Sequence, residues 1–454
     1  MKSNIENLLN QSAQYGIEYL QTLDDRKVFP DQQSLVALAR FREPLPEHST
    51  SPEDVIEFLH RTGSPSTVAS AGGRYFGFVV GGSVPASLAA HWLAGAWDQN
   101  AGLEVLSPVA AFLEQVCVQW LHELLEIPSD SGIGFVTGAT MANCSALISA
   151  RNILLQRKGW DVHAKGLFGA PPIRVIVGQE VHSSALKALD LAGLGRERVE
   201  TIPTDDQGRM RADAVKNLDD HTILCLQAGN VNTGAFDPAD KIIPLAKQAG
   251  AWVHVDGAFG LWAAVSSEKK YLLSGYRDAD SWATDAHKWL NVPYDSGVVI
   301  VKHAGDLVNA MYQGGAYLDQ SGERVPYQFT PELSRKARGV EIWAAIKSLG
   351  RNGLEELINR NCRQARRFAE GLTNAGFEIL NDVVLNQVLV SFGTDAETSS
   401  IISAIQKDGT CWCGGTQWHG RTAMRISVSS WATTDDDVEK SLAAMIRCAK
   451  DIKG

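Results

Sequence analysis

The sequence predicts an α/β protein with a mostly parallel sheet and a smaller second domain of α+β type toward the C-terminus. Two observations carry this prediction. From about Ser131 onward, short apolar or β-branched runs alternate with helical stretches, which is typical of a parallel sheet covered by helices on both faces. Beyond residue 340 a long helical stretch is followed by further strand patterns. A chain of 454 residues is also long enough for more than one domain.

The first 70 residues are polar and acidic, and five prolines interrupt their helical patterns. We expect helices and loops that pack on the outside of something else, because the segment contains little apolar material for a core of its own. The sequence therefore divides into an N-terminal helical segment at 1–70, a large domain at 71–340 and a small C-terminal domain at 341–454.

The expected elements follow in order. Helices are predicted at 143–155 and 239–249, and the stretch 335–350 reads as a long helix. The small domain should contain strands within 377–392 and 423–430, with helices at 398–407 and 435–450. The predicted strands of the large domain are GIGFVTG (132–138), IRVIVG (173–178), TILCLQAG (222–229), AWVHVDGAF (251–259) and SGVVIVK (296–302).

Composition excludes several classes of protein. The net charge of −10 argues against a nucleic-acid surface, which needs a basic stripe. The start of the chain lacks the pattern of a signal peptide, and the most apolar stretch, 76–97, is broken by glycine, proline and histidine. Seven irregularly spaced cysteines, of which only Cys411 and Cys413 are close, suggest reduced thiols and no metal site. We therefore expect a cytoplasmic protein without membrane or nucleic-acid partners.

In open α/β sheets a ligand lies beyond the carboxyl ends of the strands, so the residues that follow each strand are informative. Gly138 ends the first predicted strand, and Ala139 and Thr140 begin the helix after it. A glycine turn and the free N–H groups of a helix start can bind a phosphate. The alternative is an ordinary helix cap in which Thr140 is the capping residue.

The next two strand ends carry a histidine and an amide. His182 follows the second strand and could lay its ring on an aromatic cofactor, or it could be an ordinary surface or core histidine. Asn230, in AGNVNTG after the third strand, could line a polar site or simply form a turn.

The last two strand ends carry an acid and a lysine. Asp256 ends an apolar strand, where a carboxylate needs a partner: a protonated pyridine nitrogen, a helix start or a salt bridge. Lys288 follows within DAHKWLN, beside His287 and Trp289. A lysine in a partly apolar pocket near other cations can form a Schiff base, whereas most single lysines are solvated surface charges. Together these positions supply every contact that pyridoxal 5′-phosphate (PLP) needs: phosphate, ring face, ring nitrogen and aldehyde.

From about Arg74 to the C-terminus the sequence resembles the group II PLP-dependent amino-acid decarboxylases, which include aromatic-L-amino-acid, glutamate and tyrosine decarboxylases. The most specific part is HVDGAFG followed by DAHKWLN and PYDSGVVIVK. The resemblance implies PLP-dependent transferase fold type I, which is the aspartate-aminotransferase-like fold. It also implies a homodimer in which the N-terminal segment packs on the partner and the active site lies at the interface.

The resemblance also assigns roles to the residues above. Lys288 would be the Schiff-base lysine, His182 the ring-stacking residue and Asp256 the partner of the pyridine nitrogen. The other implied cofactor contacts are Ala258 beneath the ring, Ala139 and Thr140 at the phosphate, Asn230 where many members have a threonine near the ring hydroxyl, and Asp285 and His287 beside the lysine. Animal aromatic decarboxylases have asparagine at the position of Asp285.

Substrate choice and proton donation depend on loops. The segment 74–86 aligns with the substrate-side loop and offers Phe78, Val79 and Val80 where aromatic decarboxylases place larger rings and a proline. The loop with the family's proton-donating tyrosine should lie near 322–333, where Tyr327 is the nearest candidate. Arg425 could bind the substrate carboxylate or pair within the small domain.

The leading hypothesis is therefore a PLP-dependent carboxy-lyase of amino-acid metabolism that converts an L-amino acid into the amine and CO₂. An aminotransferase, an oxidative deaminase or an aldehyde-lyase would use the same cofactor residues. A non-catalytic module that holds PLP or another small molecule is a further alternative. A nucleotide-binding protein is excluded because no phosphate-binding motif has the right spacing.

Overall fold

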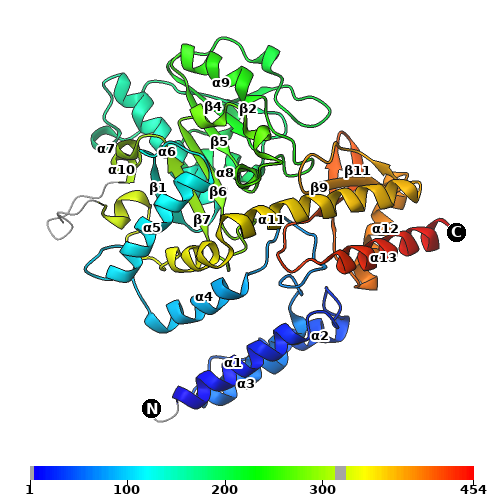
Figure 1. The fold of residues 1–454 in the computed structure, drawn as a ribbon. Helices are drawn as coiled ribbons and strands as arrows, with labels where there is room; N and C mark the ends of the chain where they lie inside the picture. The colour runs from blue at the N-terminus through cyan, green and yellow to red at the C-terminus, as the bar shows by residue number, and fades with distance from the viewer. Residues whose placement is uncertain (1–4, 312–323) are drawn as a thin grey trace. The chain divides into compact units, whose positions relative to one another are not determined.

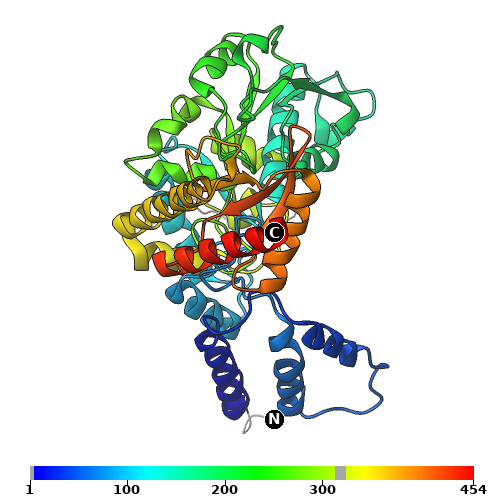
Figure 2. The same cartoon turned by 90° about the vertical axis from the view of Figure 1, so that its right-hand side faces the viewer.

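The computed structural model of the protein describes residues 5–311 and 324–454. The chain forms two compact units, each built from separate stretches of sequence. One unit contains residues 83–366 and 381–388, and the other contains residues 1–82, 367–380 and 389–454. Figures 1 and 2 show the elements in two perpendicular views. The expected boundary near residue 340 coincides with the start of helix α11 (Gly339–Asn374).

The larger unit is organised around a seven-stranded sheet of order β1-β7-β6-β5-β4-β2-β3. Only β7 is antiparallel to its neighbours β1 and β6, and the other pairs are parallel. Every residue of β4, β5 and β6 is buried, so both faces of the central sheet are covered. The strands are β1 (Gly132–Val136), β2 (Arg174–Gly178), β3 (Val199–Ile202), β4 (Thr222–Gln227), β5 (Trp252–Asp256), β6 (Ser281–Asp285) and β7 (Gly297–Val301). The mostly parallel sheet expected from the sequence is confirmed.

Helix α6 (Ala139–Arg157) is the central helix of this unit and packs on β5, β6 and β7 (Figure 1). Its small and apolar side chains form one buried cluster with the sheet, which includes Ala142, Trp252 and Ala283. The other helices of the unit are α4 (Pro85–Trp97), α5 (Pro108–Leu124), α7 (Val162–Lys165), α8 (Ser183–Leu191), α9 (Ala239–Gln248), α10 (Ala304–Met311) and the first part of α11, which has a kink at Gly350 with φ of 61°. Short 3₁₀ turns lie at Arg196–Arg198, Ala212–Ala214, Gly260–Val265, Lys270–Leu273, Tyr276–Asp278 and Pro326–Phe329.

The second unit contains the N-terminal helices and an antiparallel four-stranded sheet of order β10-β11-β9-β8. Helices α12 and α13 both begin with capping boxes, at Thr394 and Thr434, which satisfy the first free N–H groups. The elements are α1 (Ile5–Gln21), α2 (Gln32–Ala37), α3 (Pro52–Gly63), β8 (Glu378–Ile379), β9 (Gln387–Ser391), β10 (Gly414–Trp418), β11 (Arg421–Ser427), α12 (Asp395–Asp408) and α13 (Asp435–Lys453), with 3₁₀ turns at Leu38–Phe41 and Ser64–Ser66.

Three strands were not predicted, and each lacks a strong apolar pattern. The edge strand β3 exposes its two middle residues, Glu200 and Thr201. The buried strand β6 reads SWATD, which is short and rich in small and polar residues, and β10 begins with two glycines. These strands form because their neighbours complete the sheets, since strand formation depends strongly on tertiary context.

Candidate active site

The carboxyl ends of the central strands lie side by side. Gln227 of β4 pairs in register with Asp256 of β5, and Asp256 pairs with Ala283 of β6. Asp285 is therefore two residues further along the neighbouring strand, and its N–H donates to the carbonyl of Ala258 at 2.8 Å. This register gathers the predicted residues of two separate sequence motifs at one edge of the sheet.

Asp256 is a buried carboxylate with two N–H donors. Its Oδ1 accepts from the backbone N–H of Ala258 at 3.2 Å, and its Oδ2 accepts from Nδ2 of Asn143 at 3.1 Å. Donors of this kind are what make a buried carboxylate tolerable. The side chain neither caps a helix nor forms an ion pair among the described residues, so both ordinary explanations for this acid fail.

Lys288 is held by Asp285. Its Nζ lies 2.9 Å from Asp285 Oδ2, and the other oxygen of Asp285 accepts from the N–H of Ala139 at 2.6 Å. The lysine side chain is only 20% exposed and that of Asp285 only 3%. Lys288 is thus not a solvated surface charge, because Asp285 connects it to the start of α6.

The start of α6 can accommodate an anion. The N-cap residue is Gly138, which has no side chain to cap the helix, so the capping role considered for Thr140 is absent. The N–H groups of Thr140 and Met141 lie in the first turn, where no intrahelical acceptor is available. A phosphate could accept hydrogen bonds from these N–H groups. The neighbouring N–H of Ala139 already donates to the carboxylate of Asp285.

His287 is oriented by its own loop. Its Nδ1 accepts from the N–H of Ser296 at 3.1 Å, and its ring lies over that of Tyr294 with centroids 4.4 Å apart. Burial lowers the pKa of His287, which favours the neutral ring. With Nδ1 as acceptor, the hydrogen is on Nε2, which faces Asp285 Oδ1 at 3.4 Å.

His182 and Asn230 both order their local backbone. His182 is half-buried and caps α8, because its Nδ1 accepts from the N–H of Ser184 at 3.2 Å. Asn230 is 1% exposed, and its Oδ1 accepts from the N–H groups of Asn232 and Thr233. Both side chains therefore stabilise the backbone next to them, and their contacts with a cofactor stay predictions.

Tyr327 lies in the 3₁₀ turn Pro326–Phe329, and its side chain is buried with Leu103 and Val325. Its N–H donates to the carbonyl of Gly102 at 3.0 Å. The resemblance implied a loop near 322–333, and Tyr327 lies there in a short turn with its side chain buried. Residues 322–323, at the start of that stretch, lie outside the described residues.

Two side chains near Asp256 were not singled out in the sequence. Asn143 donates to Asp256, and His254 contacts Asn143. The signal was present, because Trp252, His254 and Asp256 alternate along one predicted strand and so share one face of the sheet. Arg425, on β11 of the other unit, is partly buried, and burial lowers its pKa.

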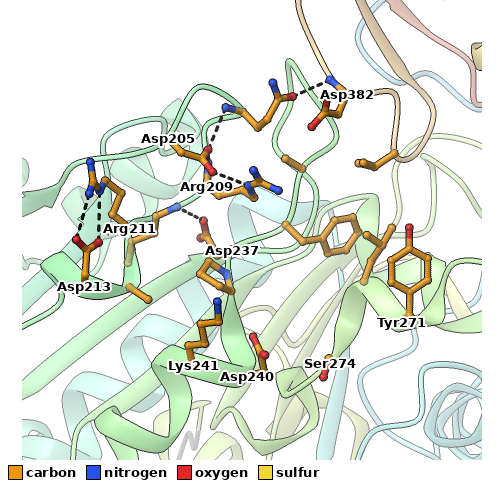
Figure 3. A pocket seen from close by; sticks show the side chains of 18 residues that line it. Asp205, Arg209, Arg211, Asp213, Asp237, Asp240, Lys241, Tyr271, Ser274 and Asp382 are labelled. Carbon is orange, nitrogen blue, oxygen red and sulfur yellow. Dashed lines mark hydrogen bonds and ion pairs between the residues drawn. The ribbon is translucent and has the colours of Figure 1, made fainter.

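Figure 3 shows a cavity of about 720 Å³ in the larger unit that contains none of the predicted site residues. Two ion pairs lie in its lining, Asp205–Arg209 at 2.6 Å and Arg211–Asp213 at 3.1 Å. Asp237 accepts from the N–H groups of Met210 and Gln227, and burial raises its pKa to about 6. Asp237, which lines the cavity, thus fixes the end of β4 by accepting from the N–H of Gln227.

Other kinds of site find no support in the part of the chain that the structure describes. No three or more histidine, cysteine or acidic side chains gather as metal ligands there. Within the same ranges, no helix has the length and apolar content to cross a bilayer. The seven cysteines are buried free thiols.

The features of PLP-binding enzymes are a lysine paired at a strand end, a buried acid on the neighbouring strand and a helix start with free N–H groups, all in one α/β sheet. Comparison with known proteins then gives the family. Residues 37–394 match the pyridoxal-dependent decarboxylase conserved domain. The chain belongs to the pyridoxal-dependent decarboxylase family.

Individual relatives are distant in sequence and close in fold. The chain is 23% identical to the aromatic-L-amino-acid decarboxylase of Bacillus atrophaeus, an alignment that covers 97% of this chain and 95% of the relative. It is 29% identical to the mouse acidic amino acid decarboxylase GADL1 over 72% of this chain but only 60% of that protein. A crystal structure of Oryza sativa TDC with PLP and tryptamine superposes with a TM-score of 0.92 at 20% identity, covering 100% and 99% of the two chains.

The predicted resemblance and the fold are confirmed by these matches. The protein is a lyase of the amino-acid decarboxylase class, and its cofactor is PLP. The residues at the strand ends fit that cofactor, because they supply a lysine, a buried acceptor and a helix start at which the N–H groups of Thr140 and Met141 have no intrahelical acceptor.

Proposed function

We propose that this chain decarboxylates an L-amino acid to the corresponding amine and CO₂ at the strand-end cluster of Lys288, Asp256 and the start of α6. The observation that carries the proposal is the link from Lys288 through Asp285 to Ala139, beside the buried Asp256. When bound, PLP supplies an electron sink for the pair released as the bond between Cα and the carboxylate breaks.

Lys288 would hold the cofactor aldehyde, and Asp285 keeps the lysine Nζ at the end of β6. Asp256 would accept the hydrogen of the ring nitrogen, with Ala258 beneath the ring. The remaining proposed contacts are His182 on the ring face, Asn230 near the ring hydroxyl, and Ala139, Thr140 and His287 at the phosphate.

Tyr327 is our proposed proton donor to Cα, which completes amine formation. Its side chain is buried with Leu103 and Val325. Proton delivery at Cα gives an amine, whereas delivery to the cofactor gives a carbonyl product and pyridoxamine phosphate. Tyr327→Phe should therefore keep PLP binding, lose most amine production and accumulate carbonyl product. Product analysis by mass spectrometry checks this, and amine at the parent rate would place the donor elsewhere.

We further propose a cytoplasmic homodimer with the active site at the subunit interface. Helices α4 and α5 and the loop between them expose large apolar side chains, which soluble monomers rarely gather in one region. This α4–α5 surface comprises Trp92, Leu93, Trp97, Val105, Leu106, Val109 and Phe112. Helix α1 also supports a dimer, because none of its residues is buried although Ile5, Leu9 and Ile17 are apolar. The segment 1–70 would pack on the partner.

The chemistry is tested by incubating the PLP-loaded protein with a mixture of L-amino acids and identifying CO₂, amines and keto acids. Amine and CO₂ in equal amounts are expected. Keto acid and pyridoxamine phosphate alone would make the protein an aminotransferase.

The attachment site is tested separately by borohydride reduction and peptide mapping. The reduced cofactor should lie on the peptide of Lys288. It should be absent in Lys288→Arg, which keeps a cation beside Asp285, and present in Lys269→Arg, which alters another buried lysine. Label on a different lysine would overturn the assignment.

A further inference from the structure

A line of buried polar side chains runs through the core behind Asp256. Trp252, His254 and Asp256 share one face of β5 because strand side chains alternate. Ser281 of β6 pairs in register with His254. Helix α6 packs on these strands and contributes Asn143.

The five side chains form a continuous set of hydrogen bonds. Trp252 Nε1 lies 2.9 Å from Ser281 Oγ, and the same oxygen lies 2.9 Å from His254 Nδ1. His254 Nε2 lies 2.9 Å from Asn143 Oδ1, and Asn143 Nδ2 lies 3.1 Å from Asp256 Oδ2. The three middle residues are wholly inaccessible to solvent. Buried polar networks are stable only when their members are satisfied in this way.

The far end of the chain is compatible with one direction of donation. An indole N–H can only donate, so Ser281 Oγ accepts from Trp252, and its own hydrogen is then free to be donated to His254 Nδ1. A neutral histidine that accepts at Nδ1 carries its hydrogen on Nε2. That N–H then donates to Asn143 Oδ1, which turns the amide nitrogen of Asn143 toward Asp256.

The hydrogen bond from Asn143 to Asp256, at the near end of the chain, requires the same direction of donation. If Asn143 were turned over, its amide oxygen would face a carboxylate oxygen across about the same distance, with no hydrogen between them. Complete burial also lowers the pKa of His254 to about 3, so the ring is neutral and has one N–H to donate. The hydrogen bond from Asn143 to Asp256 and the neutral ring of His254 therefore fix the direction of the chain, and the contacts of Ser281 are compatible with it.

We propose that Trp252, Ser281, His254 and Asn143 position Asp256, because together they hold the amide N–H of Asn143 against its carboxylate. The remaining acceptor capacity of that carboxylate is thereby kept available to the ring nitrogen of PLP. This inference rests on the proposed role of Asp256. None of the four residues is a catalytic residue, because each acts through its neighbour.

The test compares apo-proteins prepared from four variants. Asn143→Ala and His254→Leu break the chain, whereas His254→Gln keeps an N–H donor close to the place of Nε2. Asn152→Ala is the matched control, because Asn152 is another buried asparagine of α6, and its Oδ1 accepts from the guanidinium of Arg151 and not from the chain. The readouts are the dissociation constant for PLP and the ¹⁵N chemical shift of the bound, ring-labelled cofactor, which reports protonation of the ring nitrogen.

Asn143→Ala and His254→Leu should weaken PLP binding by roughly ten- to a hundredfold and shift the ring ¹⁵N resonance toward its deprotonated position. His254→Gln should recover most of both losses, and Asn152→Ala should match the parent protein. Folded chain-breaking variants with parental affinity and an unchanged resonance would overturn the proposal.

Two further outcomes are also decisive. If the chain-breaking variants do not fold, Ser281→Ala removes only one hydroxyl at the far end, and it should give a smaller change in the same two readouts. No change in that folded variant would overturn the proposal. If the parent protein itself does not bind PLP at Lys288, the proposed function fails first, and the absence of label in the borohydride experiment identifies that case.

Discussion

At the scale of single residues, the buried carboxylate of Asp256 is stabilised by the N–H donors around it. Asparagine at this position would turn an amide group toward the N–H of Ala258 or toward Asn143, and one hydrogen bond to a charged acceptor would be lost. Such a bond contributes roughly 1.5–3 kcal/mol. Asp256→Asn should therefore weaken PLP binding and lower turnover by several tenfold steps, because a neutral partner no longer favours a protonated ring nitrogen. Steady-state kinetics at saturating PLP measures this, and near-parental turnover would remove Asp256 from the mechanism.

His254 makes stability depend on pH in a definite direction. Burial lowers its pKa from 6.5 to about 3, so between these values the unfolded chain binds more protons than the folded protein. The contribution of His254 to stability is therefore complete above about pH 6.5 and is lost as the pH falls toward 3.

Between pH 6.5 and 4.5 the parent protein should lose up to about 3 kcal/mol of stability that His254→Gln does not lose. The melting temperature of the two apo-proteins, measured across this range, checks the prediction. Parallel curves would show that His254 does not titrate on unfolding.

At the scale of elements, the turn between β1 and α6 depends on a glycine from another strand. Gly297 of β7 pairs with Val136 of β1 on one side and with Asp285 of β6 on the other. A Cβ at Gly297 would lie 2.4 Å from the Cα of Gly138, which is the N-cap residue of α6. The helix start can therefore approach Asp285 only because β7 begins with glycine.

Gly297→Ala should displace the start of α6 and weaken PLP binding at least tenfold, since backbone rather than a flexible side chain must move. Gly305→Ala is the control, because a Cβ at Gly305 meets nothing within 4 Å. Cofactor titration of the two apo-proteins measures the difference. Equal affinities would show that the turn can relax without affecting the site.

At the scale of the whole molecule, the α4–α5 surface predicts association with a second copy. Phe112 is 65% exposed, and a charge there should prevent burial of the surface. Phe112→Glu should therefore give monomers and reduce activity, whereas Phe168→Glu should remain dimeric although Phe168 is 99% exposed. Sedimentation velocity and light scattering distinguish the two states. A dimeric Phe112→Glu protein, or a fully active parental monomer, would contradict the interface.

The division of the molecule into two units could be predicted only in part. The pattern change near residue 340 lies between the strands of the mostly parallel sheet and those of the antiparallel sheet. The compact larger unit nevertheless continues to Arg366 and takes in 381–388, while 1–82 clusters with the C-terminal stretch. Such boundaries are set by contacts between segments far apart in sequence, and local sequence patterns do not reveal these contacts.

The sequence by itself determined the fold class, the cofactor and the identity of Lys288 and Asp256 as candidates, because strand ends in a parallel sheet are marked by the residues that follow apolar runs. Only the tertiary structure decided what each side chain contacts. Asp285 joins Lys288 to the start of α6 through the pairing of β6 with its neighbours, and Asn143 reaches Asp256 across 113 positions of sequence. Tyr327 illustrates the same limit, since a stretch with the composition of a loop is buried by contacts that only the folded chain provides.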